Sequence, residues 1–194
     1  MEPLQYTSLV SMFFATCSRD DFGGWYKRTD GQWLHYSRDF LRDSAIYLSI
    51  ALNNRGLKPH DSVSIIAPSS PEWFIADIAT QINHAQVAPL FPNISSENFT
   101  FQCDDSGAQI LFVNTIAELD EPLHKFLPRF KLIICINPAS ELPENGIYWN
   151  NLIDEGKELA ESNRYFSWTR KKLRQKSSVS ICRAQNVTCE VEYG

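Results

Sequence analysis

The sequence predicts an α/β fold, with a mostly parallel sheet, flanking helices and an N-terminal β-hairpin. Three observations support this prediction. Short apolar runs alternate with amphipathic stretches along most of the chain, as in successive strand–helix units. Two of these runs, residues 110–113 and 132–136, are apolar throughout, which is typical of strands buried on both faces. An Asp-Gly pair between two aromatic-rich runs indicates the hairpin.

The size of the chain favours one domain. It has 194 residues, of which 43% are hydrophobic and 21% charged, enough apolar material for a substantial core. Residues 1–163 carry 11 basic and 21 acidic side chains, whereas residues 164–194 carry 7 basic and 2 acidic ones. We therefore expect residues 1–163 to form the folded body and residues 164–194 to be a basic, irregular tail.

The first expected elements precede residue 56. A mildly apolar segment predicts a short helix over residues 4–15. The hairpin follows, with strands at residues 25–28 and 32–36 and with Asp30-Gly31 in its turn, where both residues must tolerate positive φ. Ser37 can cap a helix reaching to about residue 55, and Gly56 suits its left-handed C-terminal position.

The most regular segment, residues 62–91, reads as strand, helix and strand. The helix has a well-defined start, because Ser70 can serve as N-cap, Pro71 suits the first helical position and Glu72 complements the helix dipole. Its apolar residues then recur at spacings of three and four, at Phe74, Ile78, Ile82 and Ala85. We expect this unit to lie at the centre of the sheet.

The later elements follow the same alternation. Ser95 can cap a helix that Gly107 ends. A helix is expected over residues 119–126, with Pro122 in its first turn. After the strand at 132–136, residues 138–146 are expected to form a loop and residues 148–162 a final helix.

No catalytic residue, cofactor-binding residue or metal ligand is predicted in this chain. It has no G-x-G-x-x-G or G-x-x-x-x-G-K-[ST] phosphate loop and no G-x-S-x-G nucleophile elbow. Asp104 and Asp105 are adjacent, so they point in different directions on a helix and suit a solvated helix end. The histidines are scattered without metal-ligand spacing, and we expect surface or loop positions for His35, His60, His84 and His124.

The sequence indicates the partners and location of the protein mainly through the classes that it disfavours. A net charge of −5 argues against a general nucleic-acid binder, and no apolar run is long enough to span a bilayer. The first 18 residues lack the basic start of a secretory signal peptide. Five cysteines without a C-x-x-C pair favour reduced thiols and hence a cytoplasmic protein.

Several of these segments, taken in order, resemble the N-terminal part of the AMP-forming acyl-CoA synthetases, and most of all the long-chain fatty acid–CoA ligases. The matching runs are Trp33-Leu34-His35-Tyr36-Ser37, residues 55–63, Ser70-Pro71-Glu72-Trp73, Asp77-Ile78-Ala79, residues 85–91 and Asp105-Ser106-Gly107-Ala108. Residues 1–163 would then be a partial N-terminal adenylating domain. Family members usually have glycine where this chain has His60 and His84, so each histidine would be strained if the backbone there has positive φ.

The resemblance implies an ATP-dependent ligase that makes an acyl-adenylate and then an acyl-CoA. ATP, Mg²⁺, coenzyme A and a fatty acid are implied for full-length relatives, and no cofactor is expected for this chain. The family's phosphate loop would be expected shortly after Arg164, and the sequence has none there. We expect a truncated, inactive segment; whether it is an enzyme stays open. The alternative is a non-catalytic α/β module that binds an acyl ligand or a partner protein, whose identity the sequence does not indicate.

Overall fold

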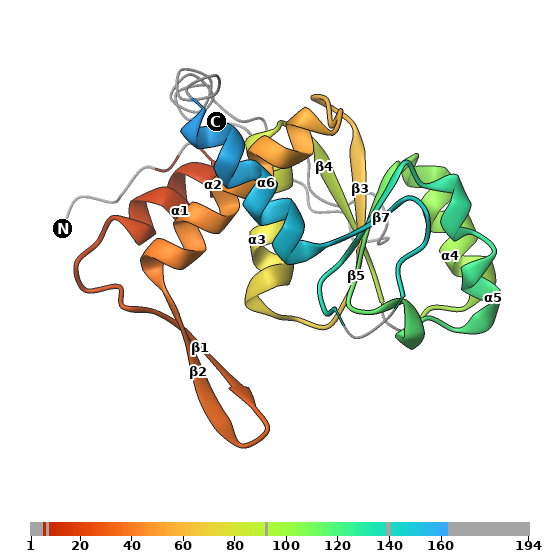
Figure 1. Cartoon of the computed structure of the whole chain (residues 1–194), viewed down its shortest axis with the longest axis horizontal. Helices are drawn as coiled ribbons and strands as arrows, with labels where there is room; N and C mark the ends of the chain where they lie inside the picture. The colour runs from red at the N-terminus through yellow and green to blue at the C-terminus, as the bar shows by residue number, and fades with distance from the viewer. Residues whose placement is uncertain (1–5, 7, 92, 139–140, 163–194) are drawn as a thin grey trace, which may run out of the picture.

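The computed structural model describes residue 6 and residues 8–91, 93–138 and 141–162 (Figure 1). The N-terminal third of this part comprises a helix, a hairpin and a long helix: α1 (Leu9–Cys17), β1 (Gly24–Thr29), β2 (Gln32–Ser37) and α2 (Arg38–Asn54). The rest alternates strands with helices: β3 (Ser62–Ile66), α3 (Pro71–Ile82), β4 (Gln86–Leu90), α4 (Ser96–Ser106), β5 (Ile110–Val113), η1 (Ile116–Glu118), α5 (Glu121–His124), η2 (Leu127–Arg129), β6 (Leu132–Cys135), β7 (Gly146–Tyr148) and α6 (Trp149–Glu161).

The main sheet has five strands in the order β4-β3-β5-β6-β7, and every neighbouring pair is parallel. This confirms the predicted fold class. The separate antiparallel hairpin β1-β2 is also confirmed, and its turn residues Asp30 and Gly31 have φ values of 51° and 80°. The unit at residues 62–91 is central only in part, because β3 is an interior strand whereas β4 lies at an edge of the described sheet.

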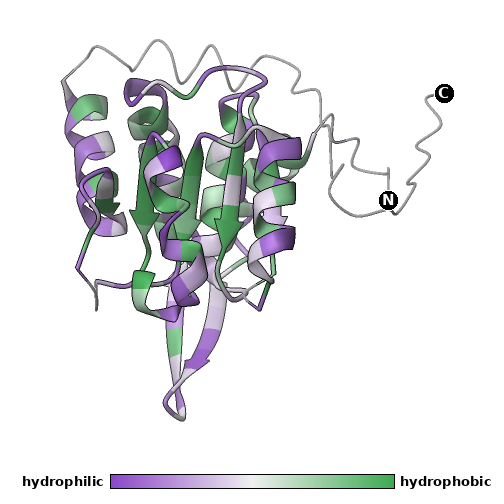
Figure 2. Ribbon diagram, turned by 90° about the vertical axis from the view of Figure 1, so that its right-hand side faces the viewer, coloured by the Kyte–Doolittle hydropathy of each residue, from purple (hydrophilic) through white to green (hydrophobic). Residues whose placement is uncertain are grey.

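Helices cover both faces of the sheet, which gives three layers (Figures 1 and 2). Along β5, successive side chains point to opposite faces, so Phe112 belongs to one core cluster and Leu111 to the other. The first core joins the sheet to α1, α2, α3 and α6, and the second joins it to α4, α5 and the two 3₁₀ turns. The helices show polar outer surfaces in Figure 2, while the central strands are apolar.

Helix starts follow the side chains that the sequence indicated. Ser37, Ser70 and Ser95 each accept a hydrogen bond from the backbone N–H three residues ahead, at 3.1, 3.1 and 3.3 Å. Gly56 and Gly107 have φ values of 97° and 62°, as expected for helix C-termini. None of the described helices combines the length and apolarity that a membrane crossing requires.

Three expected elements need correction. The first helix begins at Leu9 after the Ser8 cap, and most of residues 4–7 lie outside the described part. The helix expected over 119–126 is a four-residue helix between two 3₁₀ turns, because Pro122 fits only its first turn and Pro128 has no N–H to donate to the His124 carbonyl. The expected loop at 138–146 ends in strand β7, which pairs with β6. The predicted tail, residues 164–194, lies outside the described residues.

Candidate functional site

The strand order creates a topological switch point at the edge of the sheet where the carboxyl ends of the strands lie. From β3 the chain first adds β4 on one side and then crosses to add β5 on the other. The loops that leave β3 and β5 therefore diverge, one toward each face. In open parallel sheets, ligands bind outside the carboxyl ends of the strands at such a switch point.

Polar side chains follow the strands at this edge. Ser69 is exposed after β3, Asn114 is half-buried after β5, and Asn137 is exposed after β6. Backbone pairing continues beyond the strands. The backbone N–H of Asn114 donates to the Ile66 carbonyl at 3.3 Å, and the backbone N–H of Asn137 donates to the Asn114 carbonyl at 2.8 Å. The Asn114 amide also donates to both carboxylate oxygens of Glu118, at 2.7 and 2.6 Å. The polar side chains at this edge are thus one hydroxyl, two neutral amides and one carboxylate.

The N-terminus of α3, which opens onto the same edge, is partly satisfied by its own residues. Ser70 Oγ accepts the Trp73 N–H, and the Ser70 carbonyl accepts the Phe74 N–H at 3.2 Å. Pro71 has no N–H, and the carboxylate of Glu72 supplies the negative charge that a helix N-terminus favours. This carboxylate would repel a phosphate bound at the helix N-terminus.

The loops at the carboxyl edge also lack cations. Residues 67–70, 91–94, 114–115 and 136–137 contain neither Lys nor Arg. A triphosphate needs charge-assisted donors or a glycine-rich nest of backbone N–H groups, and these loops have neither. The edge can therefore position a neighbouring segment or a neutral group, but its own residues supply no phosphate chemistry.

The other sequence candidates remain dispersed. His35, His60 and His124 are exposed and His84 is half-buried, each in a separate strand, turn or helix end. Asp104 and Asp105 are both exposed at the end of α4, and Asp104 pairs with Arg129. Across the part of the chain that the structure describes, no three His, Cys, Asp or Glu side chains are grouped to hold a metal ion.

Nucleophilic cysteine chemistry is disfavoured by burial. Cys17, Cys103 and Cys135 are free, buried thiols. Burial raises the pKa of both Cys103 and Cys135 to about 11, and it also raises the pKa of Cys17. These groups are therefore protonated at neutral pH and poorly nucleophilic. Burial likewise raises the pKa of Asp77, against the opposing hydrogen bond from Gln81.

A second feature is the hairpin, which projects from the body in both ribbon views (Figures 1 and 2). Aromatic contacts hold its root. The ring centroid of Phe74 lies 4.5 Å from that of Trp25 and 5.7 Å from that of Phe13. Tyr36 meets Phe40 edge-on at 5.6 Å. Burial and the Glu72 carboxylate raise the pKa of Tyr36. The Ser70–Phe74 motif thus begins α3 and also fixes the hairpin to it.

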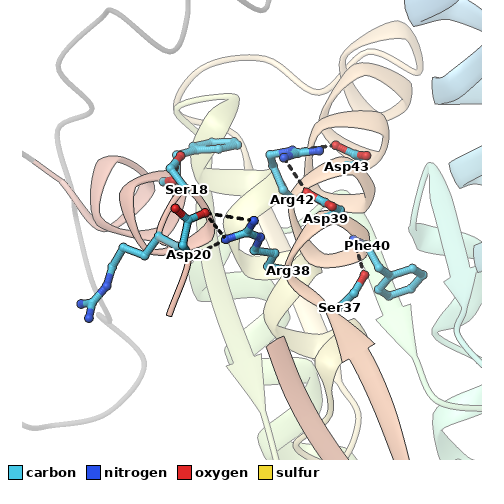
Figure 3. Close-up of polar contacts among 10 residues, drawn as sticks. Ser18, Asp20, Ser37, Arg38, Asp39, Phe40, Arg42 and Asp43 are labelled. Carbon is cyan, nitrogen blue, oxygen red and sulfur yellow. Dashed lines mark hydrogen bonds and ion pairs between the residues drawn. The ribbon is translucent and has the colours of Figure 1, made fainter. Parts of the chain in front are cut away.

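Polar contacts at the start of α2 support the same root (Figure 3). Arg38 donates to the Arg19 carbonyl and pairs with Asp20 at 3.3 Å, which ties α2 to the segment after α1. Arg42 pairs with Asp39 and Asp43 at 2.7 and 2.8 Å. These pairs are largely exposed, so they orient the root more than they stabilise it.

Beyond the root, the hairpin leaves large apolar side chains in solvent. Tyr26 and Trp33 are 63% and 66% exposed, and Leu34 is 45% exposed. The hairpin was predicted from the sequence, whereas this exposed surface was not. The signal was present in the adjacent residues Trp33 and Leu34, because neighbours in a strand point to opposite faces and a core can cover only one of them.

Comparison with known protein families gives one match over most of the chain. The family described as AMP-binding enzyme matches residues 22–177. The matched range begins just before the hairpin, includes the whole described sheet and extends past α6.

Individual relatives agree with this match. Long-chain-fatty-acid–CoA ligase ACSBG1 of Bos taurus is 27% identical over 139 residues, covering 70% of this chain and 19% of the relative. The human protein of the same name is 28% identical over 144 residues, with the same coverage of 70% and 19%. The chain therefore spans about a fifth of the length of these curated relatives.

Solved structures share the fold. Acetoacetyl-CoA synthetase from Streptomyces lividans superposes with a TM-score of 0.61 and 20% identity, over 73% of this chain and 24% of that protein. An acyl-CoA synthetase from Brucella canis gives 0.59 and 19%, over 73% of this chain and 27% of that protein. At these identities the likeness concerns architecture alone.

Proposed function

Because the chain belongs to the AMP-binding enzyme family, we propose that its body is the N-terminal scaffold of a long-chain fatty acid–CoA ligase. In this proposal, the five-stranded sheet and its helices support an adenylating domain. The chemistry, which forms an acyl-adenylate from ATP and a fatty acid and then an acyl-CoA, belongs to segments with a phosphate loop. The related long-chain fatty acid–CoA ligases support the substrate class.

We also propose that the 194-residue chain alone does not adenylate a fatty acid. One observation carries this proposal: the loops at the carboxyl edge of the sheet contain no Lys or Arg, and the chain has no glycine-rich phosphate motif. ATP, Mg²⁺ and coenzyme A would be bound by other parts of a complete ligase. The division between residues 163 and 164 and a cytoplasmic location remain predictions of the same proposal.

The test is ATP–pyrophosphate exchange by the purified chain with palmitate and Mg²⁺. We expect no exchange above a blank without protein, while a full-length long-chain ligase in the same assay exchanges readily. A cooperative thermal unfolding transition for the chain must accompany the result, so that inactivity is not due to misfolding. Robust exchange by the chain would contradict the proposal.

A second candidate is a non-catalytic module that binds an acyl ligand or a partner protein. The exposed aromatic side chains of the hairpin, Tyr26 and Trp33, favour the partner-protein form. Acyl binding is tested separately, since palmitate that binds the folded state must raise the melting temperature. An unchanged melting temperature with saturating palmitate would exclude the acyl form.

A further inference from the structure

The strand pairing of the hairpin sorts its exposed residues onto two faces. Tyr26 lies opposite His35, and Arg28 lies opposite Trp33, so these four side chains share one face. All four are exposed, and the rings of Tyr26 and His35 stack at 4.7 Å. We call this set the hairpin face. Its composition of Trp, Tyr and Arg is the one that dominates binding energy at protein–protein interfaces.

The hairpin face carries positive charge without a carboxylate. Its guanidinium, Arg28, forms no ion pair among the described residues, and the nearest acidic side chain of the hairpin is Asp30 at the turn. An acidic apex disfavours end-on insertion into an anionic membrane, and Thr29 and Gln32 beside it are polar. The face therefore fits a protein surface that presents carboxylates.

Such a surface occurs on this chain itself. Helix α6 exposes Asp154, Glu158 and Glu161 at spacings of four and three along its outer side, with one cation, Lys157, between them. This side therefore carries a net negative charge, and we call it the acidic stripe. The neighbouring Glu155 is excluded from the stripe, because it pairs with Arg55 at 2.6 Å. The hairpin and the C-terminal half of α6 lie at different ends of the molecule (Figure 1).

We propose that the hairpin is an exchanged arm, which packs its Tyr26–Arg28–Trp33–His35 face against the acidic stripe of α6 in a second copy of this chain. Two antiparallel copies related by a two-fold axis make this contact twice. Arg28 then meets carboxylates, and Trp33 and Tyr26 leave water.

The area available favours this reciprocal arrangement. Four partly exposed side chains of this kind offer on the order of 400 Å². A stable complex buries about 800 Å² on each partner, so one arm alone is too small. In the two-fold arrangement each copy contributes an arm and an acceptor surface, which brings the buried area to roughly the required size.

The proposal is tested by sedimentation equilibrium of the full chain without nucleotide or fatty acid, which keeps it independent of the proposed ligase scaffold. We expect a reversible monomer–dimer equilibrium. Trp33→Ser should weaken dimerisation at least about tenfold, as expected for an interface anchor. Phe101→Ser is the matched control, because Phe101 is 68% exposed on α4, away from both surfaces, and its loss should leave the equilibrium unchanged.

Charge-reversal variants test whether the acidic stripe of α6 is the surface that accepts the arm. Arg28→Glu and Glu158→Lys should each weaken the dimer, and the double variant should recover most of the loss. A chain that stays monomeric at all concentrations overturns the proposal, and so does equal sensitivity to Phe101→Ser. Cosedimentation with phosphatidylserine vesicles that depends on Trp33, without self-association, would assign the face to a lipid surface. If the full chain were monomeric and dimerised only after residues 164–194 were removed, the tail would be assigned as the native occupant of these surfaces.

Discussion

Two histidines occupy backbone conformations that favour glycine. His60 and His84 have φ values of 70° and 57°, the positive values at which a histidine was expected to be strained. The two positions are coupled, because the His60 N–H donates to the His84 carbonyl at 2.8 Å. This bond joins the turn before β3 to the turn before β4, so the left-handed conformations align the starts of two paired strands.

Relief of this strain gives the first prediction. His60→Gly should stabilise the chain by roughly 1 kcal/mol, because His60 is exposed and its side chain has little packing to lose. The rise in melting temperature should be about 2–4 °C for a domain of this size. His60→Ala is the control: it removes the same side chain but keeps the strained φ, so no gain is expected. An equal gain from alanine would refute the backbone explanation.

Asp77 gives a second prediction, which concerns pH. Burial raises its pKa, so the folded state holds the proton more tightly than the unfolded state does. Its contribution to stability is therefore greatest at acidic pH and declines as pH rises through the titration range of the carboxyl group. Asp77→Asn should stabilise the chain at neutral pH and flatten this part of the pH profile.

The Asp77→Asn variant retains the hydrogen bond that Gln81 donates at 3.0 Å, since the asparagine oxygen can accept it. Urea denaturation at several pH values measures the difference between the two proteins. If the stability gained from Asp77→Asn were smaller at neutral pH than at acidic pH, the desolvation argument would be wrong.

At the scale of elements, the tightest packing joins α2 to α6. A Cβ atom on Gly156 would lie 1.9 Å from the Tyr47 carbonyl oxygen, so the two helix backbones approach more closely than any side chain allows. Beside this contact, the Arg55–Glu155 ion pair joins the C-terminal end of α2 to the middle of α6. Glycine at this position thus sets the separation of two helices that cover one face of the sheet.

Gly156→Ala should therefore force α6 away from α2 and destabilise the chain by about 1–3 kcal/mol. Asn151→Ala is a suitable control, because Asn151 is exposed on the same helix and its loss should change stability by less than about 0.5 kcal/mol. Guanidinium denaturation of both variants measures the difference. Similar stability of the two variants would mean that the interface adjusts without strain.

Local chemistry explains why many elements were predictable. Serine caps, the Asp30-Gly31 turn and apolar runs act within a few residues, and the sequence displays them directly. Strand β7 was missed because three half-buried residues carry too short a pattern. The candidate site was also missed, because the switch point between β3 and β5 depends on strand order. Strand order follows from pairing between residues more than 40 positions apart, which local patterns do not encode.

At the scale of the whole molecule, one edge of the described sheet is protected against further pairing. The Gln86 N–H donates to the Asp61 carbonyl at 2.8 Å, so Gln86 and every second residue after it turn their backbone groups toward β3. Pro89 therefore faces outward, where a strand from another molecule would require an N–H donor. Proline on an edge strand is a common device against aggregation.

Pro89→Val should consequently increase aggregation, although valine suits a strand. We expect faster growth of light scattering on mild heating, because the edge regains an unpaired N–H. Pro68→Val, in an exposed loop after β3, serves as the control and should scatter like the parent. If both variants aggregated equally, loss of proline stiffness rather than edge pairing would be responsible.

The pairing of α2 with α6 has a consequence for synthesis. About 100 residues separate Arg55 from its partner Glu155, and a ribosome adds roughly 5–20 residues each second. The side of α2 that α6 later covers thus emerges roughly 5–20 seconds before α6 exists. During that interval the nascent chain exposes an apolar helix surface beside an incomplete sheet. Chaperones that recognise such surfaces should therefore bind it before residue 161 leaves the ribosome, and release it when α6 docks.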